Sequence, residues 1–262
     1  MSELLKSIVR IMINIKSRLF FSLYPHYISR RNAVLKIGHK SFLTAGKIRL
    51  GQNAVLRIGN NVNISGNIYL GNGSIFSIAD SVNIENYNIT VGDHSTLELS
   101  EGVIISAPKS SKGQIDIASG SIVIDKFSFV KANLFVRFGG ELRIGKYTGF
   151  SDGTEIVCDE RIMIGDYCML SYNLNIYDTN SHSTDWKKRR VALENKGAET
   201  EKPDTKPVII GNDVWIGKNA SIIKGAVIGE RCIVGLGTLV SEGNYEPDSI
   251  LIGSSLKVIS RK

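Results

Sequence analysis

A spacing of six residues between aliphatic side chains constrains the fold of this chain more than any other feature. From Ile210 to Val240 an aliphatic residue stands at every sixth position, and glycine directly follows four of the six. The same step occurs in earlier blocks, which cover residues 58–82, 91–103, 117–135, 144–162 and 164–176. A period of six fits neither a helix nor a simple strand alternation. It predicts a solenoid in which each hexapeptide makes a short strand and a corner around one axial core.

The composition fits an all-β chain with many tight corners. The 262 residues include 26 glycines and five prolines, of which only Pro108 lies between residues 26 and 202. Glycine and asparagine accept the left-handed backbone dihedrals that tight corners need. Scarce proline suits strands whose N–H groups bond to neighbouring strands. We therefore expect parallel coils stacked about 4.7–4.9 Å apart.

The charge balance narrows the partners. A net charge of +7 suits nucleic acid, an anionic membrane or a phosphorylated small ligand. The sequence has no Arg-rich helix and no basic-aromatic pattern typical of nucleic-acid binding, so we expect no nucleic-acid partner. The cysteines Cys158, Cys168 and Cys232 lack a CxxC spacing. We interpret them as structural thiols in a reduced, cytoplasmic compartment.

Residues 1–31 form a separate segment before a predicted main domain of residues 32–262. Apolar residues recur at helical spacing from Leu4 to Leu23. Basic residues interrupt every apolar run before it reaches the roughly 18–20 residues of a membrane span. This pattern predicts a basic amphipathic α-helix. It either packs on the domain or a neighbouring subunit, or rests peripherally on the anionic cytoplasmic face of the inner membrane.

The stretch "VIIGNDVWIGKNASIIKGAVIGERCIVGLGTLV" resembles the hexapeptide-repeat acyltransferases, most of all the bacterial saccharide and polysaccharide O-acetyltransferases. The resemblance is specific over about residues 144–260. It implies a left-handed parallel β-helix with three hexapeptides in each triangular coil. It also implies an acyl-coenzyme A donor, with acetyl-coenzyme A expected, and a homotrimer whose active sites form between subunits.

The repeat is interrupted from about residue 178 to residue 207, and one histidine, His182, lies near the start of this break. A long excursion from a compact repeat usually has a function. The run "DTNSHSTD" resembles the catalytic loop of the family, which implies that His182 is the general base. An imidazole with an ordinary pKa near 6.5 can take the proton of an attacking hydroxyl and return it to the departing thiolate.

Three further residues are candidates on the acceptor side. Asp178 could orient the imidazole, bind a sugar hydroxyl, or cap backbone N–H groups at the start of the loop. Asp159 and Ser151 match positions that contact the acceptor in the resembling family. The stretch "CDERIMIG" around Asp159 equally suits a solvated corner.

The donor side is assigned by the same resemblance. Trp215, in "DVWIG", corresponds to a tryptophan beside the catalytic cleft and the pantetheine arm, although it could also simply pack over a coil. The other residues that the resemblance places along the donor groove are Gly217, Lys218, Gly235, Leu236 and Lys257. A cation near the end of the groove suits the phosphates of coenzyme A.

The histidines also address a rival chemistry. The related γ-class carbonic anhydrases need three converging histidines, but no histidine here has another within ten residues, so we expect no metal. The resemblance implies a saccharide O-acetyltransferase that modifies a bacterial capsule or O-antigen, or its precursor. The alternatives are an N-acetyltransferase of an amino sugar or xenobiotic, and a non-catalytic β-solenoid scaffold. The absence of a G-x-G-x-x-G motif disfavours the amino-sugar enzymes that carry a Rossmann-like domain.

Overall fold

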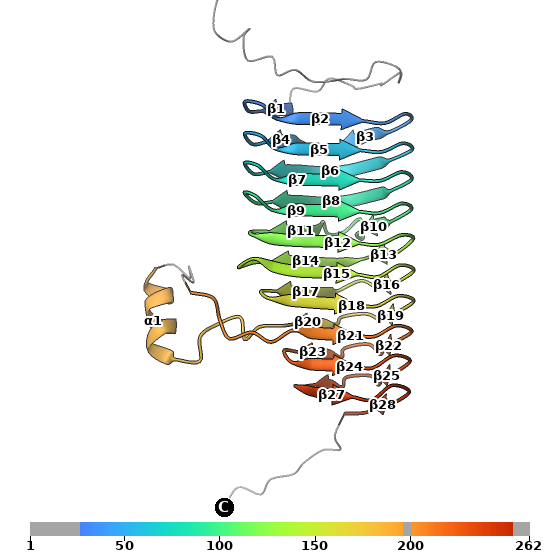
Figure 1. Ribbon diagram of the computed structural model, residues 1–262, viewed down its shortest axis with the longest axis vertical. Coiled ribbons are helices and arrows are strands. Elements are labelled where there is room, and N and C mark those ends of the chain that lie inside the picture. Colours follow the sequence, from blue (N-terminus) through green and yellow to red (C-terminus); the bar gives the residue numbers. More distant parts are fainter. Residues whose placement is uncertain (1–26, 196–200, 254–262) are drawn as a thin grey trace, which may run out of the picture.

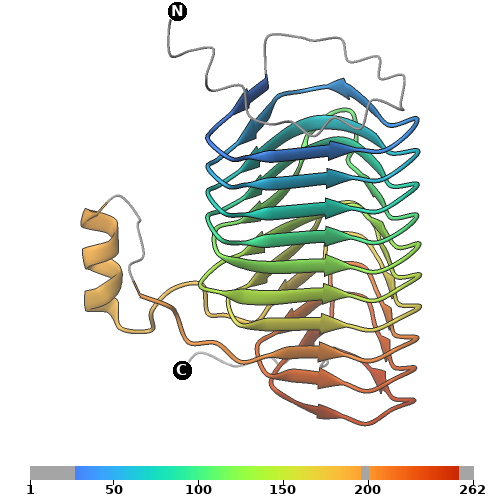
Figure 2. The same ribbon diagram turned by 45° about the horizontal axis from the view of Figure 1, so that its top comes forward.

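The computed structural model describes residues 27–195 and 201–253. They form a tall stack of triangular coils from which one arm, residues 178–207, projects sideways (Figures 1 and 2). All strand pairings between neighbouring coils are parallel; the one antiparallel bridge, Thr179 with Thr205, joins the two ends of the arm. This architecture confirms the predicted all-β solenoid.

One face of the stack is a ten-stranded sheet, which we call the front face. Its strands are β2 (Val34–Ile37), β5 (Val55–Ile58), β7 (Ile75–Ile78), β9 (Thr96–Leu99), β12 (Gly120–Ile124), β15 (Gly140–Ile144), β18 (Arg161–Ile164), β21 (Val208–Ile210), β24 (Ala226–Ile228) and β27 (Gly243–Tyr245). In Figure 1 these strands face the viewer and run from left to right while the coils descend from blue to red. A coil that advances in this sense is left-handed, as predicted.

An 18-stranded sheet covers the other two faces. Its upper strands are β1 (Tyr27–Ser29), β3 (Phe42–Ala45), β4 (Ile48–Leu50), β6 (Asn63–Leu70), β8 (Asn83–Val91), β10 (Ile104–Ser106), β11 (Gly113–Ile117), β13 (Phe129–Val130) and β14 (Ala132–Val136). The lower ones are β16 (Gly149–Phe150), β17 (Thr154–Cys158), β19 (Met169–Leu170), β20 (Asn175–Tyr177), β22 (Trp215–Ile216), β23 (Ser221–Ile223), β25 (Ile233–Val234), β26 (Leu239–Val240) and β28 (Ile250–Leu251). We call the face made by β13, β16, β19, β22, β25 and β28 the short-strand face.

The aliphatic residues at six-residue spacing form the axial core. Along β6 every second side chain is buried, and Ile216, Ile222 and Ile228 are almost completely buried in successive faces of one coil and the start of the next. Burying one such side chain contributes roughly 1.5–3 kcal/mol relative to leaving it exposed. The sixfold period is therefore the packing period of the core.

The corners between the front face and the short-strand face require a left-handed residue in coil after coil. Asn61, Asp213 and Asp248 have φ between 55° and 60°, as expected for short polar side chains. Three successive coils instead place Phe127, Tyr147 and Tyr167 there, with φ between 54° and 59°. Their rings stack with centroids 5.3 and 5.1 Å apart. Stacking of about 0.5–1.5 kcal/mol for each pair offsets part of the conformational cost.

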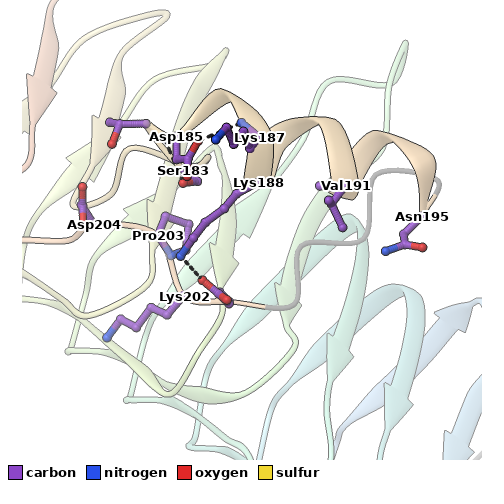
Figure 3. Close-up of a pocket in the computed structure, with 12 residues that line it drawn as sticks. Ser183, Asp185, Lys187, Lys188, Val191, Asn195, Lys202, Pro203 and Asp204 are labelled. Atoms are coloured by element: carbon purple, nitrogen blue, oxygen red, sulfur yellow. Dashed lines mark hydrogen bonds and ion pairs between the residues drawn. The ribbon is translucent and has the colours of Figure 1, made fainter.

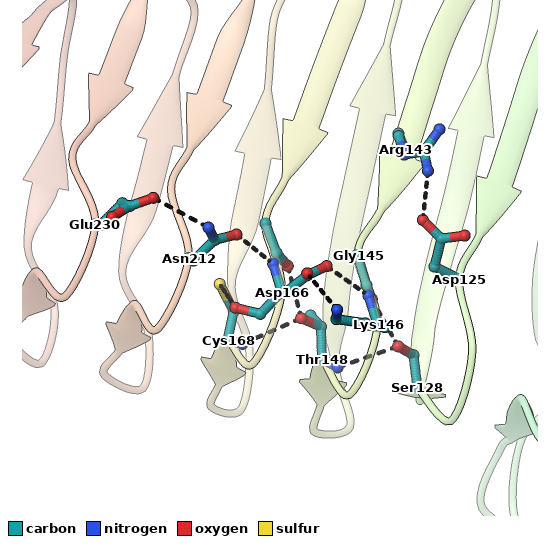
Figure 4. A network of polar contacts seen from close by, with 11 residues as sticks. Asp125, Ser128, Arg143, Gly145, Lys146, Thr148, Asp166, Cys168, Asn212 and Glu230 are labelled. Carbon is teal, nitrogen blue, oxygen red and sulfur yellow. Dashed lines mark hydrogen bonds and ion pairs between the residues drawn. The ribbon is translucent and has the colours of Figure 1, made fainter.

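Polar side chains link these corners from coil to coil (Figure 4). The Asp166 carboxylate accepts the N–H of Lys146, and the Asn212 side-chain oxygen accepts the N–H of Asp166 in the same way. The Thr148 hydroxyl donates to Gly165 O and accepts the N–H of Cys168. Each coil thus supplies the polar partners of the next, so the corners leave few backbone groups without a bond.

One boundary differs from the sequence prediction. Tyr27–Ser29 form strand β1, which pairs with β4, so the solenoid begins inside the segment expected to be helical through residue 31. The rest of that predicted helix, residues 1–26, lies outside the described residues. Within the described residues, no helix is long and apolar enough to cross a membrane.

Candidate active site

The arm leaves the solenoid after β20 and returns at β21. Its two ends are joined by the antiparallel bridge between Thr179 and Thr205 and by a bond from the N–H of Lys206 to Asp178 O. Between them lies α1 (Trp186–Glu194), whose residues are all unburied. The sequence predicted an extended loop over residues 178–207, and the helix α1 corrects that prediction.

Polar contacts cap the N-terminus of α1 and join the helix to the segment that returns to the solenoid, residues 201–207. Asp185 is the N-cap, and its carboxylate accepts the N–H of Lys187 at 2.8 Å. The Lys188 ammonium pairs with Glu201 at 2.6 Å. A hollow of about 540 Å³ lies between α1 and the returning segment, and Figure 3 shows it with Val191 and Pro203 among its lining residues. The helix therefore depends on caps and ion pairs, because it buries no apolar face.

Asp178 anchors the base of the arm. Its side chain is fully buried, and its two carboxylate oxygens accept the N–H groups of Asp159, Glu160 and Arg161 at 2.7–2.8 Å. Burial raises the pKa of Asp178, and these three N–H donors oppose that shift. Of the three roles that the sequence left open for Asp178, this geometry matches the capping of backbone N–H groups.

Asp159 is also turned inward. Its fully buried carboxylate accepts both Nε and Nη2 of Arg137 at 2.8 Å, a bidentate pair. No oxygen of Asp159 faces the solvent, so within one chain it cannot contact an acceptor directly. Asp159 and Asp178 together fix the corner at which the arm departs, which we call the arm corner.

His182 lies on the arm four residues beyond Asp178, and it is exposed. The backbone on both sides of it is held by short-range bonds. The N–H of Ser181 donates to the Thr179 hydroxyl, and Arg189 Nη1 donates to Ser183 O at 2.7 Å. The imidazole is therefore presented on an ordered stretch at the root of the arm.

The predicted donor-side residues gather elsewhere on the prism. Gly217 and Gly235 occupy the same position of one corner on successive coils and bond to β25 and β28. Ser151, which was predicted on the acceptor side, occupies the same position on another coil and bonds to β19. Lys218 and Leu236 follow directly and are exposed. Trp215 lies on the short-strand face beside this corner and is 49% exposed. Lys257 lies outside the described residues.

The short-strand face carries an apolar column next to Trp215. The residues paired at this position on successive coils are Ile104, Phe129, Gly149, Met169, Trp215, Ile233 and Ile250. A Cβ on Gly149 would lie 2.1 Å from Phe129 Cζ, so the phenyl ring covers that coil. An exposed apolar strip of this length is typical of an interaction surface.

One chain does not bring His182 and Trp215 together. In each triangular coil the short-strand face lies opposite the arm corner, because the chain passes from the front face to the short-strand face and then to the third face before reaching that corner. Figures 1 and 2 agree: the arm projects from one edge and β22 lies toward the other. The predicted site is thus split into two halves on opposite sides of the prism.

The family match falls on the half of the predicted site that contains Trp215. The family model described as "Bacterial transferase hexapeptide (six repeats)" matches residues 207–241, which contain Trp215 and three predicted donor-side glycine and lysine positions. Curated relatives that match the chain are named acetyltransferases. Residues 207–241 thus match the hexapeptide-repeat transferase model, and longer stretches of the chain are similar to acetyltransferases.

Three relatives illustrate the range of acceptors for which similar proteins are named. The galactoside O-acetyltransferase of Escherichia coli K12 is 27% identical over 53% of this chain and 66% of its own length. A Lysinibacillus sphaericus protein, provisionally named a macrolide acetyltransferase, is 30% identical over 47% and 62%. WbbJ of Escherichia coli K12, provisionally named a lipopolysaccharide biosynthesis O-acetyl transferase, is 24% identical over 42% and 56%. The chain spans about half to two thirds of the length of these relatives.

The environments of two buried thiols bear on their reactivity. Burial raises the pKa of Cys168 to about 11 and also raises the pKa of Cys158, so these thiols are not nucleophilic thiolates. Across residues 27–195 and 201–253, no group of three His, Cys, Asp or Glu side chains is placed to hold a metal ion.

Trp186 was not among the predicted site residues. The run "WKKRR" could have indicated it, because it places an aromatic residue directly before four cations.

Proposed function

We propose that this chain is an acetyl-coenzyme A-dependent O-acetyltransferase that modifies a saccharide hydroxyl of a bacterial surface polysaccharide or of its precursor. The observation that carries the proposal is the position of His182, exposed on an ordered arm that leaves a hexapeptide-repeat solenoid. Relatives named for galactoside and lipopolysaccharide O-acetylation support the acceptor class. Acetylation of intracellular precursors would place the protein in the cytoplasm, with residues 1–31 as a candidate peripheral membrane contact.

The chemistry needs one base and no covalent intermediate. The His182 imidazole takes the proton of the sugar hydroxyl as its oxygen attacks the thioester carbonyl. The tetrahedral intermediate then collapses, the C–S bond breaks, and the imidazolium protonates the thiolate of coenzyme A. A backbone N–H that faces the carbonyl oxygen would stabilise the developing charge. On the corner beside Trp215, Lys218 is the candidate for that donor, because the N–H of Gly217 already donates to Val234 O at 2.7 Å.

A second copy of the chain would complete the site. The arm of one chain would reach the short-strand face of its neighbour, so that His182 faces the neighbour's Trp215, with Gly235 and Leu236 lining the pantetheine groove. The exposed apolar column on that face supports contact between copies, and flat prism sides suit a closed threefold arrangement. Ser151 shares the corner of the donor residues and would lie in the same crevice. Asp159 and Asp178 would position the arm rather than touch the acceptor.

One alternative has a specific observation in its favour. One relative is provisionally named a macrolide acetyltransferase, and by analogy the acceptor of this chain would be an antibiotic. The solenoid above the donor corner disfavours this, because many coils precede the stretch that matches the family model and a small acceptor has no need of them. We therefore retain the saccharide as the main proposal.

An acceptor panel tests the proposed function. The full chain is incubated with acetyl-coenzyme A and galactosides, bacterial polysaccharide fragments, amino sugars or macrolides, and released thiol is measured. We expect thiol release with saccharides, and a product whose mass increases by one O-linked acetyl group. Transfer to macrolides or amines alone would replace the saccharide proposal, and no transfer to any acceptor would favour the scaffold.

A further inference from the structure

Helix α1 presents a cluster of cations whose position is not explained by folding. Its first turns contain Lys187, Lys188, Arg189 and Arg190, with no acidic residue in the first turn. The N-terminal end of a helix is already the positive end of its dipole, so cations there weaken the helix. A helix of nine residues that buries nothing is marginal to begin with. A local sequence that opposes its own secondary structure is typical of a functional segment.

Most cations of α1 have no acidic partner among the described residues. On the coils, Lys126, Arg143 and Arg161 each pair with a carboxylate of a neighbouring coil. On α1, Lys188 pairs with Glu201 of the returning segment. Among the described residues no carboxylate pairs with Lys187, Arg189 or Arg190. Among the described carboxylates, none therefore competes with an outside anion for these charges.

Trp186 holds two of these cations together. Its ring is 54% exposed, and it lies 4.9 Å from the Arg190 guanidinium carbon and 5.7 Å from the Lys187 ammonium. Cation–π attraction on this scale restrains long basic side chains that would otherwise sample many rotamers. Two cations are therefore held beside an exposed aromatic ring. The Arg190 guanidinium is a planar fork of donors, and the Lys187 ammonium is a compact point charge.

We propose that Trp186, Lys187 and Arg190 form an acceptor subsite that binds the carboxylate of an acidic saccharide. The inference rests on the proposed function and narrows its substrate to polymers that carry carboxylates. Trp186 is four residues from His182, a separation of at most about 14 Å for an extended chain. A polymer whose hydroxyl reaches the imidazole therefore has neighbouring sugar units within reach of the cation pair. The Arg190 fork matches a carboxylate in bidentate geometry.

Binding tests the subsite independently of turnover. The probe is fluorescently labelled polygalacturonate, which has a carboxylate on every sugar, together with the same polymer after reduction of its carboxyl groups to alcohols. We expect the full chain to bind the polyuronate at low salt and to bind the reduced polymer much more weakly. Arg190→Gln and Trp186→Ala should each weaken polyuronate binding roughly tenfold and leave the reduced polymer unaffected. Lys112→Gln, which removes an exposed solenoid cation, is the matched control and should change neither.

Kinetics separate this subsite from the donor site. On an acidic acceptor, Arg190→Gln should raise KM for the acceptor about tenfold while kcat and the KM for acetyl-coenzyme A stay close to those of the wild type. A raised KM for acetyl-coenzyme A instead would assign the cations to the phosphates of the donor and overturn the inference. Equal losses on reduced and unreduced polymer, or no polyuronate binding by the wild type, would also overturn it. A chain that binds polyuronate through these residues but transfers no acetyl group would sink the proposed function and keep the subsite.

Discussion

His182→Ala should lower the rate of acetyl transfer by about 10²–10⁴-fold without unfolding the chain, because a general base of this kind contributes that much. The side chain is exposed on the arm, so its removal leaves the solenoid core intact. Thiol release from acetyl-coenzyme A under saturating acceptor measures the effect. His182→Gln should be equally impaired, since an amide keeps hydrogen-bonding capacity but cannot take the proton.

The matched control is His39→Ala, which removes another exposed histidine, far from the arm. Its activity should equal that of the wild type within twofold to threefold, and both variants should melt at the same temperature as the wild type. A His182→Ala enzyme within about tenfold of wild-type activity would show that another group takes the proton.

Asp178→Ala should destabilise the fold by about 3–4 kcal/mol, because it leaves three backbone N–H groups without their acceptor in a buried corner. It should also reduce acetyl transfer, since the corner that fixes the start of the arm loosens. Chemical denaturation followed by circular dichroism gives the free energy of unfolding. Asp178→Asn should be intermediate, because its one oxygen can serve only part of the donor set.

Asp185→Ala provides the comparison for this second prediction. Asp185 caps α1 from an exposed position, so its loss should cost about 1 kcal/mol locally and leave global unfolding unchanged. An Asp178→Ala chain that is as stable as the wild type but inactive would contradict the anchoring role. The carboxylate would then act on the imidazole or on the acceptor, two of the roles that the sequence left open.

The solenoid was predictable because its core is periodic. When every sixth residue is aliphatic, a coil with six residues on each face places all of these side chains inside. Ile216, Ile222 and Ile228 occupy the expected core positions. Handedness could not be derived from the period and came from the family resemblance. The aromatic corner residues Tyr147 and Tyr167 also escaped prediction, because their stacking depends on which coil lies next to which.

The arm was harder to predict than the coil. Its helix has no apolar stripe and carries cations where a helix prefers acids, so neither periodicity nor capping rules favoured α1 over a loop. The inward orientation of Asp159 and Asp178 depends on Arg137 and on three backbone N–H groups brought from elsewhere in the coil. Sequence could place these carboxylates near the break but not decide which way they face.

Subunit complementation tests most directly whether His182 of one copy works with Trp215 of another. His182→Ala and Trp215→Ala chains, each expected to be nearly inactive alone, are unfolded together, refolded as a mixture and assayed. Random assembly at equal ratio leaves both wild-type residues facing each other in about a quarter of the sites, so the mixture should recover roughly a quarter of the wild-type rate. A mixture no more active than its two components would contradict a site shared between copies.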